Sequence, residues 1–197
     1  MKVTVLNGSP KGDLSVTLQY IRYVDKHFED HQFETVNIAS RIAAIERKEA
    51  LFEEILDTVS SADLVIWSVP LYVCLIPSQY KRFIELIFER NLTDRFKGKA
   101  AAVVTTSIHF YDHTAHNYMR GICDDLGMLF AGAFSPDMFD LMKDSERQRL
   151  LDFASTMFSV AKSGRGFAKL SDEIDYTMPA YRPGPASEPV HTGGRTI

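Results

Sequence analysis

Short apolar segments alternate with longer amphipathic segments over most of the chain. The apolar segments are rich in β-branched residues, which is typical of buried strands; they span residues 2–6, 33–38, 63–67, 99–106 and 128–134. Elsewhere apolar residues recur at a helical spacing, which predicts helices from Ser15 onward and over residues 42–59, 78–90, 115–126 and 145–163. Gly127 and Gly164 follow two of these segments, where a glycine commonly ends a helix.

Strands that alternate with helices predict an α/β fold, in which a parallel sheet carries helices on both faces. No internal repeat or linker divides the first part of the sequence, so we predict one domain over residues 1–164. Residues 165–197 are rich in proline and glycine, a composition that by itself is typical of disorder. We expect them to form an extended C-terminal tail that packs on a partner subunit or beside the ligand. The alternative is a tail held only by its own domain.

Composition narrows the class of protein. A chain of 197 residues is long enough for one domain with a sizeable core. Its formal net charge of -4, without a basic stripe, argues against nucleic-acid binding. The two cysteines, Cys74 and Cys123, cannot build a disulfide framework or ligate an iron–sulfur cluster, and they suit a reducing, cytoplasmic location. The sequence starts on a predicted strand and holds no membrane-length apolar run, so we expect neither a signal peptide nor a membrane span.

The loop after the first predicted strand has the composition of an anion site. In open parallel sheets, ligands bind beyond the carboxyl ends of the strands. Gly8 would let backbone approach a ligand, and the following helix would present free amides and its positive dipole end. Lysine and hydroxyl side chains that suit a phosphate are Ser9, Lys11, Ser15 and Thr17. The alternative is a plain strand–helix turn with Ser15 as N-cap, and neither a Walker loop nor Gly-x-Gly-x-x-Gly is present.

Two further loops leave predicted strands at the same edge. Residues 69–77 place Tyr72 in a proline-bounded apolar loop, which could hold a flat aromatic ligand or simply pack its own side chains. Residues 107–114 concentrate histidines and aromatic residues, and we expect Asp112, or alternatively Thr114, to cap the next helix. His116 is expected to be structural, whereas His109 lies nearest the strand end. No carboxylate–histidine set elsewhere supports a metal site, so none is predicted.

Three stretches together resemble the flavodoxin-like NAD(P)H-dependent FMN reductase and quinone reductase family. They read "VLNGSPKGDLSVTLQ", "ADLVIWSVPLYVCLIPSQYKRFIE" and "KAAAVVTTS…YMRGICDDLGM", and the resemblance covers about residues 1–164. It implies a flavodoxin-like three-layer sandwich with five parallel strands in the order 2-1-3-4-5, and FMN at the switch between the first and third strands.

The resemblance also implies roles for particular residues. The FMN phosphate would be held by Ser9, Lys11, Ser15, Thr17 and the backbone amide of Val16, which stands where many members have asparagine. The flavin would be lined by Pro70, Leu71, Tyr72 and Val73, the last replacing a frequent tryptophan. A third wall would come from Thr106, Ser107, Ile108 and His109, where relatives often have a glycine-rich run.

The activity implied by this resemblance is that of an FMN-dependent oxidoreductase. NADPH or NADH would give a hydride to FMN, and a small oxidant such as a quinone would take the electrons. His109 is the candidate proton donor. Two alternatives remain at this point: a flavodoxin-type electron carrier, and a protein that binds another phosphorylated ligand. The resemblance also implies a homodimer or a higher homo-oligomer. The tail, with its aromatic residues Tyr176 and Tyr181, would suit a dimer in which one chain covers its partner.

Overall fold

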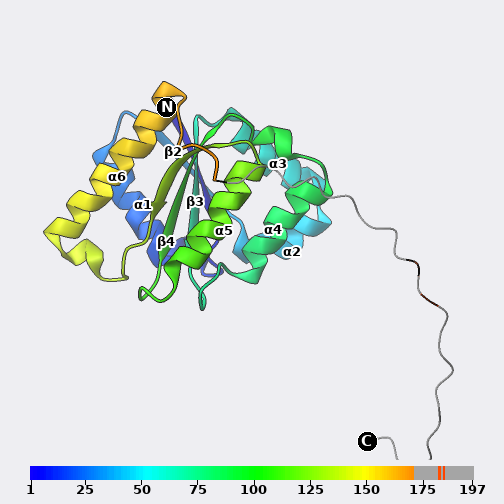
Figure 1. The fold of residues 1–197 in the computed structure, drawn as a ribbon, viewed down its shortest axis with the longest axis horizontal. Helices are drawn as coiled ribbons and strands as arrows, with labels where there is room; N and C mark the ends of the chain where they lie inside the picture. The colour runs from blue at the N-terminus through cyan, green and yellow to red at the C-terminus, as the bar shows by residue number, and fades with distance from the viewer. Residues whose placement is uncertain (171–181, 183, 185–197) are drawn as a thin grey trace, which may run out of the picture.

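Five parallel strands form a single sheet in the order β2-β1-β3-β4-β5 (Figure 1). The structure is a computed structural model that describes residues 1–170, 182 and 184. Its strands are β1 (Lys2–Asn7), β2 (Gln32–Asn37), β3 (Leu64–Pro70), β4 (Ala100–Thr106) and β5 (Leu129–Phe134). The predicted flavodoxin-like fold, with its strand order, is therefore confirmed.

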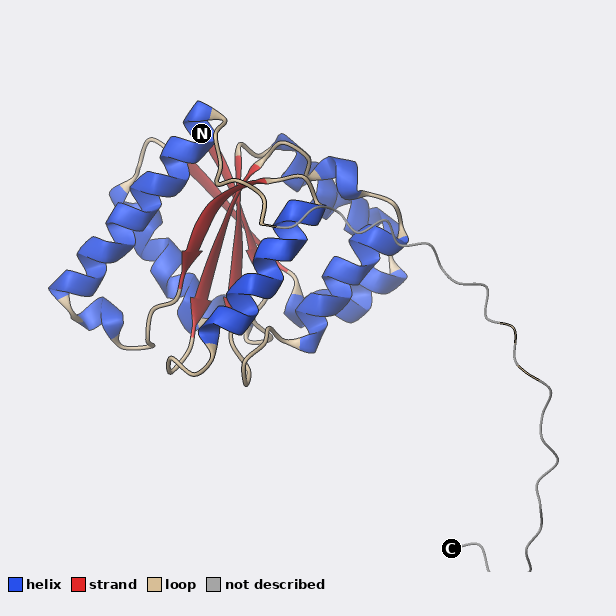
Figure 2. Ribbon diagram, viewed as in Figure 1, coloured by secondary structure: helices blue, strands red, loops and turns tan. Residues whose placement is uncertain are grey.

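Helices cover both faces of this sheet, as Figures 1 and 2 show. One face carries α1 (Val16–His27) and α6 (Asp144–Ser163). The other face carries α2 (Ile42–Arg47), α3 (Glu49–Ser61), α4 (Ser78–Glu89) and α5 (Asp112–Asp125). Successive strand residues point to opposite faces, so Val5 packs in the core under α1 and α6 while Leu6 packs in the core under the other helices.

The prediction of a single helix over residues 42–59 is wrong. The structure has two helices there, α2 and α3, separated at Lys48, whose backbone is extended (φ -113°, ψ 98°). Ile45 is fully buried, and a continuous helix would place Lys48 and Glu49 on the same face one turn later. Both charged residues are exposed in the structure. The break therefore keeps Ile45 and Phe52 in the core while two charges remain in water.

The described start of the tail lies on its own domain. The backbone N–H of Phe167 donates to the carbonyl of Phe130 at 2.8 Å. A Cβ on Gly166 would lie 2.8 Å from the backbone of Leu129 and Phe130, so this contact requires glycine. The prediction that the tail packs on a partner, with Tyr176 and Tyr181, concerns residues outside the described part of the chain.

Candidate cofactor-binding site

A cavity of about 410 Å³ opens at the carboxyl ends of the central strands, a volume in the range of small-molecule sites. Its lining residues are Ser9, Lys11, Ser15, Val16, Thr17, Pro70, Leu71, Tyr72, Val73, Cys74, Thr106, Ser107, Ile108, Phe110 and Met138. The fold thus brings together every residue predicted to contact a cofactor except His109. Cys74, Phe110 and Met138 line the cavity as well and were not predicted.

The loop from β1 to α1 is held by a buried asparagine that sequence reasoning missed. Asn7 accepts from the backbone N–H of Ser9 at 3.1 Å and donates to the carbonyl of Gly12 at 2.9 Å. The Ser9 hydroxyl in turn accepts from the Lys11 amide at 3.3 Å. Asn7 is fully buried, and a buried amide side chain needs such hydrogen-bond partners. An asparagine at the end of a predicted buried strand is the sequence signal that could have identified this role.

At the start of α1, the structure contains the N-cap expected for a strand–helix turn and leaves backbone amides available for a ligand. Ser15 is the N-cap, because its hydroxyl accepts from the Leu18 amide at 3.4 Å. Among the hydrogen bonds of the described residues, none engages the backbone amides of Val16 and Thr17. These amides border the cavity beside Lys11 and are suited to an anion.

The structure gives a reason for a glycine at position 8 that the sequence did not indicate. A Cβ on Gly8 would lie 2.8 Å from the ring of Tyr80, so its missing side chain makes room for that ring. The Tyr80 hydroxyl donates to the carbonyl of Leu6 at 2.7 Å, and the Gly8 amide donates to the carbonyl of Ser68 at 2.7 Å. Full burial raises the pKa of Tyr80 well above its usual value, so the hydroxyl stays a donor. The loop therefore rests on a fixed aromatic platform.

The loop from β3 to α4 is a tight hairpin at the cavity mouth. The Tyr72 amide donates to the carbonyl of Leu75 at 2.8 Å, and the two residues between them, Val73 and Cys74, have φ angles of 47° and 69°. Asparagine and glycine usually occupy such left-handed turn positions, and for a β-branched valine this conformation is strained. The Leu71 amide donates to the carbonyl of Thr106 at 3.0 Å, which joins this hairpin to the end of β4.

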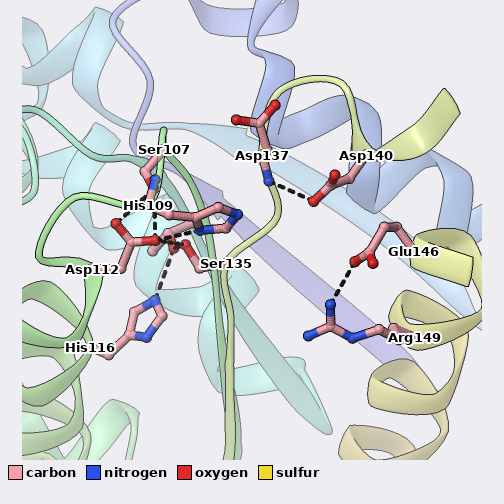
Figure 3. A network of polar contacts seen from close by, with 10 residues as sticks. Ser107, His109, Asp112, His116, Ser135, Asp137, Asp140, Glu146 and Arg149 are labelled. Carbon is pink, nitrogen blue, oxygen red and sulfur yellow. Dashed lines mark hydrogen bonds and ion pairs between the residues drawn. The ribbon is translucent and has the colours of Figure 1, made fainter. Parts of the chain in front are cut away.

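Asp112 does not cap α5, contrary to the sequence prediction. It is the first residue of the helix, which begins three residues earlier than predicted, and Tyr111 occupies the N-cap position. The Asp112 carboxylate accepts from the hydroxyls of Ser107 and Ser135, each at 2.7 Å (Figure 3). Burial acts to raise the pKa of Asp112, but hydrogen bonds from the two serines and His109 outweigh it, so the pKa lies below its usual value.

The two histidines nearest this carboxylate have different environments. His109 lies outside the cavity lining, with its side chain 54% exposed and its Nδ1 3.2 Å from the Asp112 carboxylate. His116 is half-buried, its Nε2 is 2.9 Å from the Thr105 hydroxyl, and burial lowers its pKa. His116 is thus bound into the framework, as predicted. Among residues the structure describes, no three His, Cys, Asp or Glu side chains are grouped to hold a metal ion.

A fourth loop, from β5 to α6, completes the cavity with Met138. The Tyr20 hydroxyl of α1 donates to the carbonyl of Asp137 and accepts from the Leu141 amide at 3.2 Å. The amide of Asp137 donates to the Asp140 carboxylate at 2.9 Å (Figure 3). This loop also leaves a strand at the carboxyl edge, so the edge rule used for the other three loops would have included it.

The mouth of the cavity is apolar, whereas the start of α1 and the loop before it contribute hydroxyls, amides and a lysine to the lining. Large hydrophobic side chains that stay exposed on these loops are Tyr72, Val73, Ile108, Phe110, Tyr111, Met138 and Phe139. Exposed apolar groups in this number around one opening are typical of a binding surface. The arrangement suits a ligand with an anionic group at one end and a flat ring at the other.

Comparisons with known proteins identify a family from the sequence and a shared fold from solved structures. The profile of the family described as NADPH-dependent FMN reductase matches residues 1–136. No curated protein sequence matches the chain. A solved structure of an NADH:FMN oxidoreductase (EMOB) in its apo form is 20% identical with a TM-score of 0.67, over 80% of this chain and 89% of that chain.

Two other solved structures extend this likeness. RosB with the bound intermediate 8-demethyl-8-formylriboflavin-5'-phosphate is 13% identical with a TM-score of 0.65, over 100% of this chain and 99% of that chain. An FMN-dependent NADH-azoreductase from Bacillus anthracis str. Ames Ancestor, in complex with FMN, is 14% identical with a TM-score of 0.54, over 83% and 99% of the two chains. At these identities the likeness establishes the shared fold. In the described part of the chain, no helix has the length and apolar character needed to cross a membrane.

Proposed function

Because the chain belongs to the NADPH-dependent FMN reductase family, we propose that it binds FMN in this cavity and acts as an NAD(P)H oxidoreductase toward a small acceptor such as a quinone. The observation that carries this proposal is the pairing, in one cavity, of free helix amides with an apolar mouth. Bound FMN would accept a hydride from a reduced nicotinamide and return the electrons to the acceptor.

The residues present fit FMN in their chemistry. The amides of Val16 and Thr17, the hydroxyls of Ser9 and Ser15, and the Lys11 ammonium would hold the dianionic phosphate. The flavin ring would lie among the residues from the other loops, which are Pro70, Leu71, Tyr72, Val73, Thr106, Ser107 and Ile108. These side chains would keep water from one side of the ring and align it for transfer. His109 would hold the proton that an acceptor such as a quinone takes up.

The acceptor would enter from the exposed mouth. Its side chains, including Phe110 and Met138, are apolar and favour a flat, uncharged molecule. Tyr111 and Phe139, which are exposed beside the cavity without lining it, support the homodimer that the family resemblance implies, since a second copy would remove them from water. Sedimentation velocity of the purified chain would test that assembly.

An absorption spectrum tests cofactor binding, and rapid mixing tests activity. We expect the protein to take up FMN stoichiometrically and its flavin absorbance to bleach within seconds of anaerobic mixing with NADPH or NADH. Flavin that binds but does not bleach would favour the alternative, an electron carrier of the flavodoxin type. A protein that does not retain FMN would contradict the proposal and leave another phosphorylated ligand as the candidate.

Replacing Lys11 with alanine should weaken FMN binding far more than riboflavin binding, because riboflavin lacks the phosphate. Loss of one charge-assisted contact predicts a rise of about tenfold in the FMN dissociation constant, measured by quenching of flavin fluorescence. Lys26→Ala, in the last turn of α1 and so at the helix end opposite the Lys11 loop, is the matched control and should leave both constants unchanged. Equal weakening of FMN and riboflavin by Lys11→Ala would place the phosphate elsewhere.

A further inference from the structure

The loop between β4 and α5 is built without glycine in a conformation that usually needs it. His109 and Tyr111 have φ angles of 60° and 55°, in the left-handed region that costs free energy for residues with a Cβ. Such a conformation persists only where surrounding contacts hold it, and it is found most often at functional sites. Ile108 and Phe110, next to these residues, line the cavity, so whatever holds this loop also shapes the cavity wall.

Asp112 makes the contacts that hold the loop. Both its carboxylate oxygens lie 2.7 Å from the Ser107 hydroxyl, which itself accepts from the His109 amide at 2.8 Å. The carboxylate also accepts from the Ser135 hydroxyl at 2.7 Å, and this serine belongs to the loop that follows β5. Figure 3 shows Ser107, His109 and Ser135 gathered around the one carboxylate. The Asp112 side chain is only 13% exposed, so these bonds are largely shielded from water.

The number of protons that each group carries determines which group donates and which accepts in this network. The Thr105 hydroxyl donates its single proton to the Ser135 hydroxyl at 2.9 Å, and Ser135 donates to Asp112. The Nε2 of His116, 2.9 Å from Thr105, must then be the donor to that hydroxyl. An ionised carboxylate can only accept, so the Nδ1 of His109 donates to Asp112.

We propose that Asp112 is a positioning residue of this site: its carboxylate fixes the β4–α5 loop against the β5–α6 loop and holds the Nδ1–H tautomer of His109. Its catalytic meaning rests on the proposed function. The proton on Nδ1 leaves Nε2 as the ring nitrogen that exchanges protons with a bound acceptor or with solvent.

The proposed reaction consumes a proton, which the Nε2 of His109 would supply. Reduction of a quinone by NAD(P)H uses the hydride and one further proton, and yields the hydroquinone and NAD(P)⁺. When His109 carries protons on both nitrogens, the Nε2–H bond breaks as the second O–H bond of the hydroquinone forms. The neutral ring that remains keeps its Nδ1–H bond to Asp112. Its exposed side chain then regains a proton from water.

Other charged groups near His109 do not replace Asp112 in this role. Asp140 interacts electrostatically with His109, but its carboxylate accepts from the Asp137 amide and from the Lys143 ammonium, both at 2.9 Å. His113, on the same helix as Asp112, acts electrostatically on His116. Asp112 is thus the carboxylate within hydrogen-bond distance of His109 among the described residues.

Imidazole ¹⁵N NMR of the flavin-free full-length chain tests the tautomer directly. With the rings neutral, wild-type His109 should carry its proton on Nδ1, and in Asp112→Ala it should change to the Nε2–H form that free imidazole side chains prefer. Ser135→Ala keeps the carboxylate and should keep the Nδ1–H form. Asp144→Ala, which removes one of the two acidic residues in the first turn of α6, is the matched control and should change nothing.

FMN binding to the same variants tests whether Asp112 shapes the cavity wall formed by the β4–α5 loop. The FMN dissociation constant of Asp112→Ala should rise about tenfold, and that of Asp144→Ala should stay unchanged. If Asp112→Ala does not fold, Asp112→Asn serves instead, because a neutral amide holds Nδ1–H more weakly and the fraction of that tautomer should fall. An unchanged tautomer or an unchanged FMN affinity overturns the proposal. Failure of the wild-type chain to bind FMN would instead refute the proposed function, since the NMR result needs no flavin.

Discussion

Replacing Arg120 with methionine should lower the free energy of unfolding by about 3–5 kcal/mol, the largest loss of stability we expect from one substitution in this chain. The side chains of Arg120 and Asp124 are 8% and 3% exposed, and the Arg120 Nε lies 3.1 Å from both Asp124 oxygens. Methionine would leave a buried carboxylate without its counter-charge. Urea unfolding followed by circular dichroism measures the effect.

The same pair holds the described start of the tail. Arg120 donates to the carbonyls of Phe167 and Ala168, and the Leu170 amide donates to Asp124 at 3.1 Å. Arg120→Met should therefore also release residues 165–170, which limited proteolysis would detect.

Two controls separate a buried ion pair from a surface one. Arg149→Met removes an exposed arginine that pairs with Glu146, and it should cost no more than about 1 kcal/mol. The double variant Arg120→Met with Asp124→Leu should recover part of the stability, because no lone charge remains buried. A loss in Arg120→Met no larger than in Arg149→Met would show that the pair is unimportant.

Gly8→Ala should both destabilise the protein and weaken FMN binding. The new Cβ would meet the Tyr80 ring at 2.8 Å, and this ring is fully buried and held by its bond to Leu6, so it cannot move aside. We expect a loss of about 1–3 kcal/mol, typical of overpacking. The displaced loop should raise the FMN dissociation constant at least about tenfold. Thermal unfolding and flavin fluorescence measure the two effects.

Gly121 provides the matched control for this substitution. It lies inside α5, and a Cβ there would meet nothing within 4 Å. Gly121→Ala should leave FMN binding unchanged and stabilise the helix by about 0.5–1 kcal/mol. If Gly8→Ala keeps wild-type stability and FMN affinity, Tyr80 does not constrain the first loop.

Much of the fold follows from patterns that are local in the sequence. Strand and helix periodicities predicted all five strands and the two helices that end at a glycine. Burial of one face of an element imposes a regular spacing of apolar residues, which is visible in the sequence. The incorrect prediction of a single helix over residues 42–59 could have been avoided, because Lys48 and Glu49 interrupt the apolar face that includes Ile45.

The loops of the site were predictable for the same reason. Parallel strands end at one edge, so residues that follow Asn7, Pro70 and Thr106 must meet there, and the cavity lining agrees. Met138 was missed because the edge argument stopped one strand too early.

The sequence by itself determined the strand order, through its family motifs, and the edge of the sheet at which the cavity opens, through its strand ends. Only the tertiary structure decided which partner each polar or tightly packed group has. Tyr80 under Gly8, Ser135 on Asp112 and Asn7 within the first loop are such pairings. Two side chains become partners only if the fold brings them to the right distance and orientation. Residue types and their spacing along the sequence do not specify that distance or orientation for residues far apart in the chain.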